Sequence, residues 1–239
     1  MKRSARILLV SNSTIHGRGY LDHVEPQIRE FLGGIRTVLF FPFALHDRDG
    51  YAAKAAARFA AMGYTTTSVH SMTDPREAIA RTDAIFIGGG NTFRLLKTLQ
   101  DLDLIEPIRQ RVHAGMPYIG SSAGSNVAGP TIRTTNDMPI VQPQSFNALD
   151  LVPFQLNPHF QDPDPNSTHM GETREERILQ FHEENERPVL GLREGAWIIA
   201  EPGSVTLKGA NGARIFRRGQ PPVEAKTGDE ISALVGAPK

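Results

Sequence analysis

The pentapeptide Gly120-Ser121-Ser122-Ala123-Gly124 places a serine in a pattern that can support nucleophilic catalysis. An apolar run at 116–119 precedes it, and residues 125–128 can open a helix. Gly-x-Ser-x-Gly between a strand and a helix is typical of a nucleophile elbow, a sharp turn that exposes the serine at the edge of a sheet. In such a turn the backbone N–H of Ala123 would form one half of an oxyanion hole. The alternative is a turn of small residues that only lets a helix pack close to a strand.

A serine hydroxyl needs a base to take its proton, and His159 is the best placed of the eight histidines. It follows the apolar run 154–156, and Pro158 restricts the backbone beside it. A histidine at the end of a strand lies where an open α/β sheet carries its functional groups. His16 and His70 also follow predicted strands and stay as alternatives, and each of the three could instead be a surface or packing histidine.

The base in turn needs an acceptor that holds its ring in one tautomer, and two carboxylates are placed for this. Asp137 lies in the long polar loop 129–150, and Glu194 directly follows the apolar run 189–192. The position at the end of a strand favours Glu194, and the many polar groups of the loop favour Asp137. Both stay open, with an exposed loop acid as the common alternative.

A glycine-rich segment, Gly88-Gly89-Gly90-Asn91-Thr92, follows the apolar run 84–87. It lacks the lysine of a P-loop and the spacing of a dinucleotide-binding motif. The amide of Gly89 or Gly90 could instead complete the oxyanion hole beside Ser122. The alternative is a strand-to-helix turn capped by one of the two polar residues at its end.

A rival arrangement would hold a metal ion. Nitrogen and oxygen ligands occur within eleven residues, at His159, Asp162, Asp164 and His169. Their spacing matches no zinc pattern, and the two prolines between them predict a rigid turn. A metal-dependent hydrolase is therefore a minor alternative.

The amino-acid composition argues against several classes of partner and of chemistry. The chain has 239 residues, a length that fits one α/β domain over 1–239. Its 26 basic and 26 acidic residues give no net charge, which argues against nucleic acid or an anionic membrane as the main partner. The lack of cysteine excludes disulfides and thiolate chemistry and fits a reducing compartment. No apolar stretch is long enough to span a bilayer, so we expect a soluble cytoplasmic protein.

Short apolar runs alternate with helical patterns in the first half of the chain, which predicts a parallel sheet covered by helices. The expected strands are 7–10, 37–41, 65–69, 84–87 and 116–119. The expected helices include 51–62, 93–99 and 104–112. The predicted fold class is α/β, a mostly parallel sheet with helices on both faces and antiparallel strands near the C-terminus, between 196 and 216. The tail beyond Gly219 is expected to be loosely held.

Several longer motifs resemble the peptidase E, or α-aspartyl dipeptidase, family. They are Asn91-Thr92-Phe93, Ile119-Gly120-x-Ser122-Ala123-Gly124, residues 131–139, Asn157-Pro158-His159-Phe160, Gly171-Glu172-Thr173-Arg174-Glu175 and Gly191-Leu192-x-Glu194-Gly195-x-Trp197. The likeness extends from Leu8-Leu9-x-Ser11-Asn12-Ser13 to the last strands. One departure is Ser121, where members of the family carry tryptophan, so the shape of the pocket is expected to differ.

The resemblance implies a cytoplasmic serine exopeptidase that removes the amino-terminal aspartate of Asp-X dipeptides through an acyl-enzyme. The implied fold is similar to that of class I glutamine amidotransferases. Ser122 and His159 match the nucleophile and base of the family, while Asp137 and Glu194 match two acids proposed as the third member. No metal or organic cofactor is implied.

The aspartyl side chain of such a substrate needs a cation, and a guanidinium suits a carboxylate best because it can donate two parallel hydrogen bonds. Arg174 and Arg133 lie in two of the family-like loops and are the candidates. Arg174 is slightly favoured because a capping box at 173–176 places it in the first turn of a helix, where the dipole disfavours a cation without another role.

Two other functions stay open at this point. A cyanophycinase-like exopeptidase would use the same nucleophile on β-linked aspartyl-arginine. A non-enzymatic protein could use the strand ends of the same fold to bind a small ligand. The only predicted partner is a small peptide, and the chain could be a monomer or a small homo-oligomer.

Overall fold

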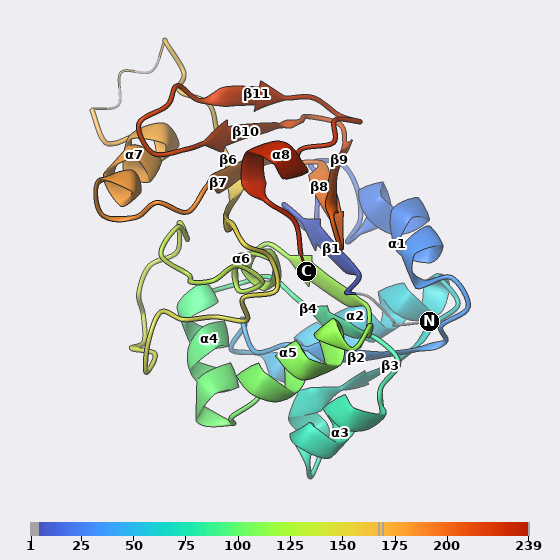
Figure 1. The fold of residues 1–239 in the computed structure, drawn as a ribbon. Helices are drawn as coiled ribbons and strands as arrows, with labels where there is room; N and C mark the ends of the chain where they lie inside the picture. The colour runs from blue at the N-terminus through green and yellow to red at the C-terminus, as the bar shows by residue number, and fades with distance from the viewer. Residues whose placement is uncertain (1–4, 167, 169, 239) are drawn as a thin grey trace.

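The computed structural model describes residues 5–166, 168 and 170–238, and two β-sheets organise this part of the chain (Figure 1). The main sheet has seven strands. In spatial order they are β3 (Thr65–Ser68), β2 (Thr37–Phe41), β4 (Ile85–Ile87), β5 (Tyr118–Ser121), β1 (Ile7–Val10), β8 (Ala196–Glu201) and β9 (Ser204–Gly209). The first five are parallel, and β8 and β9 extend the sheet in antiparallel pairing. The predicted parallel sheet with antiparallel strands near the C-terminus is confirmed.

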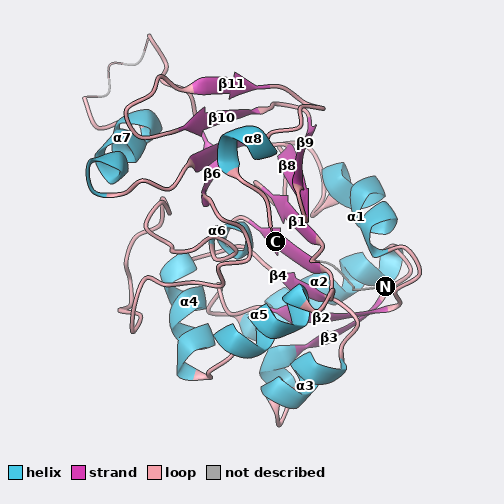
Figure 2. Cartoon of the chain, viewed as in Figure 1, coloured by secondary structure: helices cyan, strands magenta, loops and turns pink. Residues whose placement is uncertain are grey.

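Helices cover both faces of the main sheet, as Figure 2 shows. One face carries α1 (Glu25–Leu32) and α2 (Arg48–Ala61). The other carries α3 (Pro75–Arg81), α4 (Thr92–Asp101) and α5 (Ile105–His113). Alternate residues of β1 enter the two cores, because successive side chains of a strand point to opposite faces. Strands β1 and β4 are therefore apolar throughout, as expected of strands buried on both sides in a parallel sheet.

Strands of the C-terminal half form a second, four-stranded sheet. Its spatial order is β11 (Val223–Ala225), β10 (Ala213–Phe216), β7 (Val189–Arg193) and β6 (Gln155–Phe160). Only β6 and β7 are parallel in it. Helix α7 (Arg174–Glu184) begins at the predicted capping box and packs Ile178 against Phe160 and Phe216. Residues of both sheets share one buried cluster, which supports the proposal that the chain is a single domain.

The expectation of a loosely held tail beyond Gly219 is wrong. Strand β11 pairs with β10, and the short helix α8 (Ser232–Val235) follows it. Ile231 is buried, and its N–H donates to the carbonyl of Val205 at 2.8 Å. The tail therefore closes one side of the core by backbone pairing and by burial of apolar side chains.

Shorter elements complete the chain. Two single turns of 3-10 helix are η1 (Asp22–Val24) and η2 (Val69–Ser71). Helix α2 begins three residues earlier than predicted, because the Asp47 side chain caps it by accepting from the N–H of Gly50. Within the described residues, no helix is long and apolar enough to cross a bilayer.

Candidate active site

Ser122 lies on a strained turn between β5 and α6 (Ala123–Asn126), as the elbow motif predicts. Its φ of 53° is in the left-handed region, which a residue with a side chain adopts only when its surroundings force it. The flanking glycines are required by close contacts. A Cβ at Gly124 would lie 2.0 Å from the carbonyl oxygen of Ile87, and one at Gly120 would lie 2.5 Å from that of Gly124. The preceding Ser121 is fully buried in β5, so strand alternation turns it away from the side that Ser122 serves.

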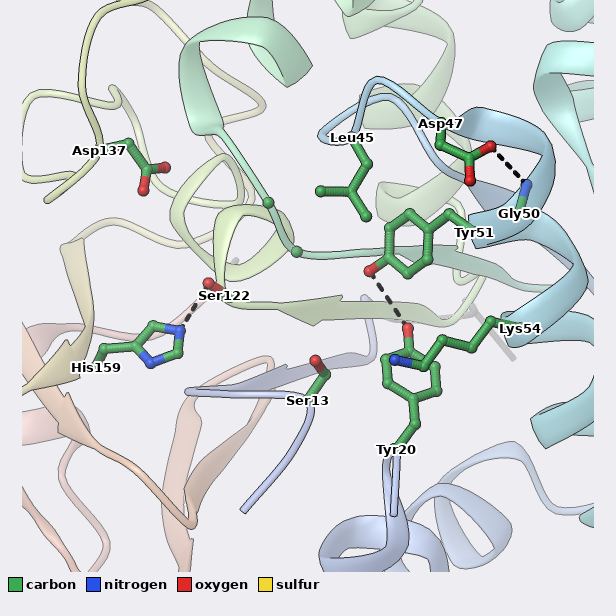
Figure 3. A pocket seen from close by; sticks show the side chains of 12 residues that line it. Ser13, Tyr20, Leu45, Asp47, Gly50, Tyr51, Lys54, Ser122, Asp137 and His159 are labelled. Carbon is green, nitrogen blue, oxygen red and sulfur yellow. Dashed lines mark hydrogen bonds between the residues drawn. The ribbon is translucent and has the colours of Figure 1, made fainter. Parts of the chain in front are cut away.

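His159 comes from the second sheet and reaches the serine across the seam between the two sheets. Its Nε2 is 2.9 Å from Ser122 Oγ (Figure 3). His159 has a φ of 54°, and the pairing of β6 with β7 shifts register between Pro158 and Phe160, which marks a bulge. A bulge changes the direction of one side chain on a strand, and here it aims the imidazole at the elbow.

Ser11, at the end of β1, holds that bulge in place. Its hydroxyl accepts the N–H of His159 at 2.9 Å and donates to the carbonyl of Leu192 at 2.7 Å. Ser11 is fully buried, so both hydrogen bonds are shielded from water. One side chain of the main sheet thus fixes the backbone of both parallel strands of the second sheet.

Glu194 completes a hydrogen-bonded chain with the serine and the histidine. It directly follows β7, and its Oε1 is 2.7 Å from His159 Nδ1. The loop that carries it is tied down by Asn211, which donates to the Glu194 carbonyl, and by Asn12, which accepts from the N–H of Gly195. The side chains of Glu194 and His159 remain 53% and 41% exposed, so the pair faces solvent.

Asp137 lies near the serine, but its carboxylate is bound elsewhere. Its Oδ2 accepts the N–H of Thr92 at 2.7 Å and the Thr92 hydroxyl at 2.6 Å, at the start of α4. An anion at this position is favoured by the helix dipole. The geometry therefore favours Glu194 over Asp137 as the partner of His159.

The predicted oxyanion donors border the serine from two elements. A Cβ at Gly89 would lie 3.0 Å from the Cβ of Ser122, so the loop after β4 approaches the elbow closely. Gly90 has a φ of 133°, which only glycine adopts readily. Ala123 is the first residue of α6, where backbone N–H groups lack partners within the helix. Gly89 and Gly90 line one cavity that borders Ser122, and Ala123 lines a second one.

Two cavities border the serine. The larger, of about 650 Å³, we call the tyrosine cavity, and Figure 3 shows it. Besides Ser122, Asp137 and His159, it is lined by Ser13, Tyr20, Leu45, Asp47, Gly50, Tyr51, Lys54, Gly89 and Gly90. The smaller, of about 300 Å³, we call the arginine cavity. Besides the same three residues, it is lined by Thr92, Ala123, Asn126, Thr135, Asn136, Pro158, Gln161, Arg174 and Glu194.

Arg174 supplies the cation of the arginine cavity. Burial lowers the pKa of its guanidinium, as does the neighbouring Arg177, while Asp137 opposes that shift. The acids beside it on the chain are already paired, Glu172 with Arg177 and Glu175 with Arg214. Arg174 is thus a partly desolvated cation beside the serine with room for an anionic ligand.

Arg133, the other predicted cation, lies outside both cavities. It is exposed, and its guanidinium stacks 5.0 Å from the centre of the Phe146 ring. Such a contact is a common way to hold an exposed arginine on a protein surface. The structure brings Arg174 to the serine and leaves Arg133 on the outer loop.

The rival metal ligands are engaged in other contacts. Asp162 forms two hydrogen bonds with Arg193, and His159 contacts Ser122 and Glu194. His169 lies outside the described residues. Among those that are described, no three histidine, aspartate or glutamate side chains are grouped in a way that could hold a metal ion.

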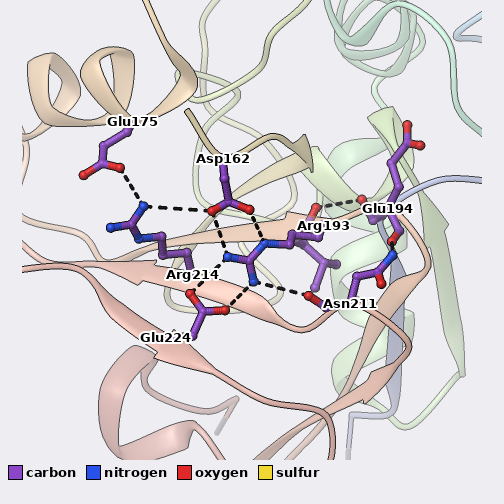
Figure 4. A network of polar contacts seen from close by, with 9 residues as sticks. Asp162, Glu175, Arg193, Glu194, Asn211, Arg214 and Glu224 are labelled. Carbon is purple, nitrogen blue, oxygen red and sulfur yellow. Dashed lines mark hydrogen bonds and ion pairs between the residues drawn. The ribbon is translucent and has the colours of Figure 1, made fainter. Parts of the chain in front are cut away.

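A network of ion pairs holds the residues next to Glu194 and Arg174 in the chain (Figure 4). Arg193, the residue before Glu194, pairs with Asp162 at 2.7 and 2.8 Å and also with Glu224. Arg214 pairs with Glu175, the residue after Arg174, at 2.8 Å. The Arg193 guanidinium holds the pKa of Asp162 below its usual value, while both carboxylates raise that of Arg193. The network joins β7, β10 and β11 to the helix that carries the candidate substrate-binding cation.

Sequence reasoning missed Ser11, Tyr20 and Lys54. A signal existed for Ser11, because a small polar residue directly after the first strand belongs to the carboxyl edge of the sheet. Tyr20 lies in a loop without a motif, and Lys54 looks like an ordinary exposed position of α2. Only the fold shows that Tyr20 and Lys54 line the same cavity as Ser122.

Known proteins resemble this chain over most of its length. The model of peptidase family S51 matches residues 7–208. Peptidase E of Streptomyces coelicolor is 51% identical over 229 residues, which cover 96% of this chain and 94% of that protein. A Drosophila melanogaster protein named "Probable alpha-aspartyl dipeptidase" is 44% identical over 220 residues, covering 91% and 92%. The solved structure of a peptidase from an acI-B1 actinobacterium superimposes with a TM-score of 0.73 at 16% identity, covering 96% and 98%, and supports the fold.

Proposed function

Because the chain belongs to peptidase family S51, we propose that it is a serine dipeptidase that hydrolyses dipeptides with an amino-terminal aspartate. The observation that carries this proposal is the hydrogen-bonded chain of Ser122, His159 and Glu194 beside a cavity that holds the available guanidinium of Arg174. The Drosophila relative is named for the same activity.

In the proposed reaction, Ser122 Oγ attacks the scissile carbonyl carbon while His159 Nε2 takes the hydroxyl proton. Glu194 accepts a hydrogen bond from Nδ1–H and stabilises the imidazolium that forms. The amide of Ala123 and that of Gly90 bind the oxyanion, since the Gly89 amide already donates to the Tyr51 hydroxyl. His159 then gives the proton to the leaving amine, and a water molecule, activated by the same imidazole, hydrolyses the aspartyl-enzyme.

Charges in the arginine cavity fit an amino-terminal aspartate. Such a residue carries an ammonium group and a carboxylate three bonds apart. Besides Glu194, which contacts His159, the cavity presents one anion, Asp137, and one cation, Arg174. We propose that Arg174 binds the β-carboxylate and that Asp137, held by Thr92, binds the α-ammonium. An aspartate inside a longer peptide lacks that ammonium, so this binding would restrict cleavage to an amino-terminal aspartate. This gives Asp137 a role in substrate binding in place of the orientation of His159.

The two other functions that the sequence left open have less support. The Drosophila name favours a dipeptidase over a cyanophycinase-like enzyme, and the assembled Ser122–His159 pair favours a hydrolase over a ligand-binding protein. A cytoplasmic location stays a prediction from the sequence.

A panel of dipeptides tests the proposal. We expect the protein to hydrolyse Asp-Leu and to discriminate against Asn-Leu, and we expect Ser122→Ala to abolish both hydrolysis and labelling by a fluorophosphonate. Arg174→Met should lower the preference for Asp-Leu over Asn-Leu by about 10- to 100-fold, the usual worth of a hydrogen bond to a charged group. Arg133→Met is the matched control and should keep the preference. A folded, labelled enzyme that cleaves no Asp-X dipeptide would contradict the proposed substrate.

A further inference from the structure

The tyrosine cavity contains a cation that the proposed reaction does not yet use. Lys54 lies on α2, and its Nζ is 4.7 Å from the centre of the Tyr20 ring. Figure 3 shows its side chain directed along that ring into the cavity. The Tyr20 hydroxyl donates to that of Tyr51 at 3.3 Å, so the aromatic wall beneath the ammonium is itself fixed. A cation over an aromatic face is held in place without losing its charge.

Acidic side chains near Lys54 are engaged by other groups, so its ammonium is available to a ligand. The acids on the neighbouring elements, Asp22 and Glu25, both pair with Arg58. Asp47 also lines the cavity, but its carboxylate caps α2 by accepting the N–H of Gly50 at 2.9 Å. In Figure 3 the Tyr51 side chain lies between Asp47 and Lys54.

The two phenols add no negative charge to this wall. Burial raises the pKa of Tyr20, and the nearby Tyr51 raises it further. Burial also raises the pKa of Tyr51, against the opposing effect of the hydrogen bonds from Tyr20 and the Gly89 amide. Both hydroxyls therefore stay neutral, and an anion that enters beside Lys54 meets an ammonium and uncharged rings.

The position of the cavity relative to the serine decides what could bind there. The acyl part and the leaving part of a peptide lie on opposite sides of the attacked carbonyl carbon. If the amino-terminal aspartate occupies the arginine cavity, as in the proposed function on which this inference rests, the second residue extends into the tyrosine cavity.

We propose that the tyrosine cavity binds the leaving residue of the dipeptide and that Lys54 pairs with its free α-carboxylate. A third residue would replace that carboxylate by an uncharged amide, so Lys54 would favour dipeptides over longer peptides. A lysine suits this role because its flexible stem can follow carboxylates of leaving residues that differ in size. The cavity of about 650 Å³ leaves room for a large side chain on that residue.

The test compares Asp-Leu with Asp-Leu-amide, which differ only in the terminal charge. We expect the wild-type enzyme to have the higher kcat/KM for the free acid. Lys54→Met keeps the length of the stem and should lower the acid-to-amide ratio by about 2- to 5-fold, since the pair is exposed to solvent. Lys54→Arg should retain most of the ratio. Lys226→Met removes a lysine from an exposed turn outside both cavities and should leave the ratio unchanged.

A second readout is ionic strength. Salt should reduce the acid-to-amide ratio of the wild type and have little effect on that of Lys54→Met, because only the first contains the pair. If Asp-Leu is hydrolysed and the ratio is the same in Lys54→Met and the wild type, this inference is overturned while the proposed function stands. If the folded wild type cleaves no Asp-X dipeptide, both are overturned.

Discussion

Replacing Glu194 by glutamine removes one charge from the candidate triad and almost no volume. The exchange leaves Ser122 and the imidazole of His159 in place and keeps a side-chain oxygen that can accept from Nδ1–H. The effect on kcat therefore reports the stabilisation of the imidazolium by the carboxylate. Asp137→Asn is the matched change in the other acid that the sequence offers.

The structure limits the size of this effect. The 2.7 Å separation of His159 Nδ1 and Glu194 Oε1 is typical of a charge-assisted hydrogen bond, which contributes about 1.5–3 kcal/mol. Both side chains are about half exposed, however, and exposed ion pairs contribute only ~0.2–1 kcal/mol. A loss of about 1–2 kcal/mol of transition-state stabilisation follows, which is roughly a 5- to 30-fold decrease in kcat. In proteases with a buried aspartate the equivalent exchange lowers kcat by about 10⁴-fold, because the buried amide also holds the histidine in the wrong tautomer.

The assay is the steady-state hydrolysis of Asp-Leu by the wild type and the two variants, with folding checked by circular dichroism. Glu194→Gln should lower kcat with little change in KM, because the interaction strengthens only in the transition state. Asp137→Asn should act mainly by raising KM, since Asp137 contacts Thr92 and the proposed substrate ammonium. A large loss of kcat in Asp137→Asn together with an unchanged Glu194→Gln would refute this assignment.

Two further predictions concern the support of the site. Ser11→Ala leaves the N–H of His159 and the carbonyl of Leu192 without their partner. Urea unfolding should therefore show a free energy of unfolding lower by about 1–3 kcal/mol. The kcat should also decrease, and an unchanged kcat would contradict the positioning role. Arg193 lowers the pKa of folded Asp162, so this carboxylate stabilises the fold above its ordinary pKa and loses that effect as pH falls. The stability difference between wild type and Asp162→Asn should shrink from neutral pH to about pH 3, and a growing difference would contradict it.

Local chemistry explains what could be predicted from the sequence. The elbow at Ser122 was identifiable because the turn itself excludes a Cβ at the flanking glycines, so the motif carries its own geometry. Strands β1 and β4 were identifiable because burial on both faces makes them apolar throughout, and β3 because its threonines are β-branched. His159 was placed by its position after an apolar run, and that position proved to be a strand of the second sheet.

Contacts between distant segments explain which features of the site could not be predicted from the sequence. The choice between Asp137 and Glu194 depends on the alignment of β6 with β7 and on the bulge at His159, neither of which leaves a local pattern. Arg133 and Arg174 look alike as loop arginines, and only packing separates the exposed one from the one in the cavity. The tail beyond Gly219 was expected to be loosely held for a different reason: β11 pairs with the preceding strand β10, but its three residues are too few to show a strand pattern.

The candidate nucleophile and base stand on different sheets, so their meeting depends on how the two sheets dock. Ser122 extends from β5 and His159 from β6, and 2.9 Å separates the reacting atoms. A displacement of about one ångström at this boundary would exceed hydrogen-bond reach although each sheet kept its own backbone pairing. On gentle heating or in dilute denaturant, turnover should therefore be lost before helical content changes, because separation of the two sheets is enough to stop the reaction.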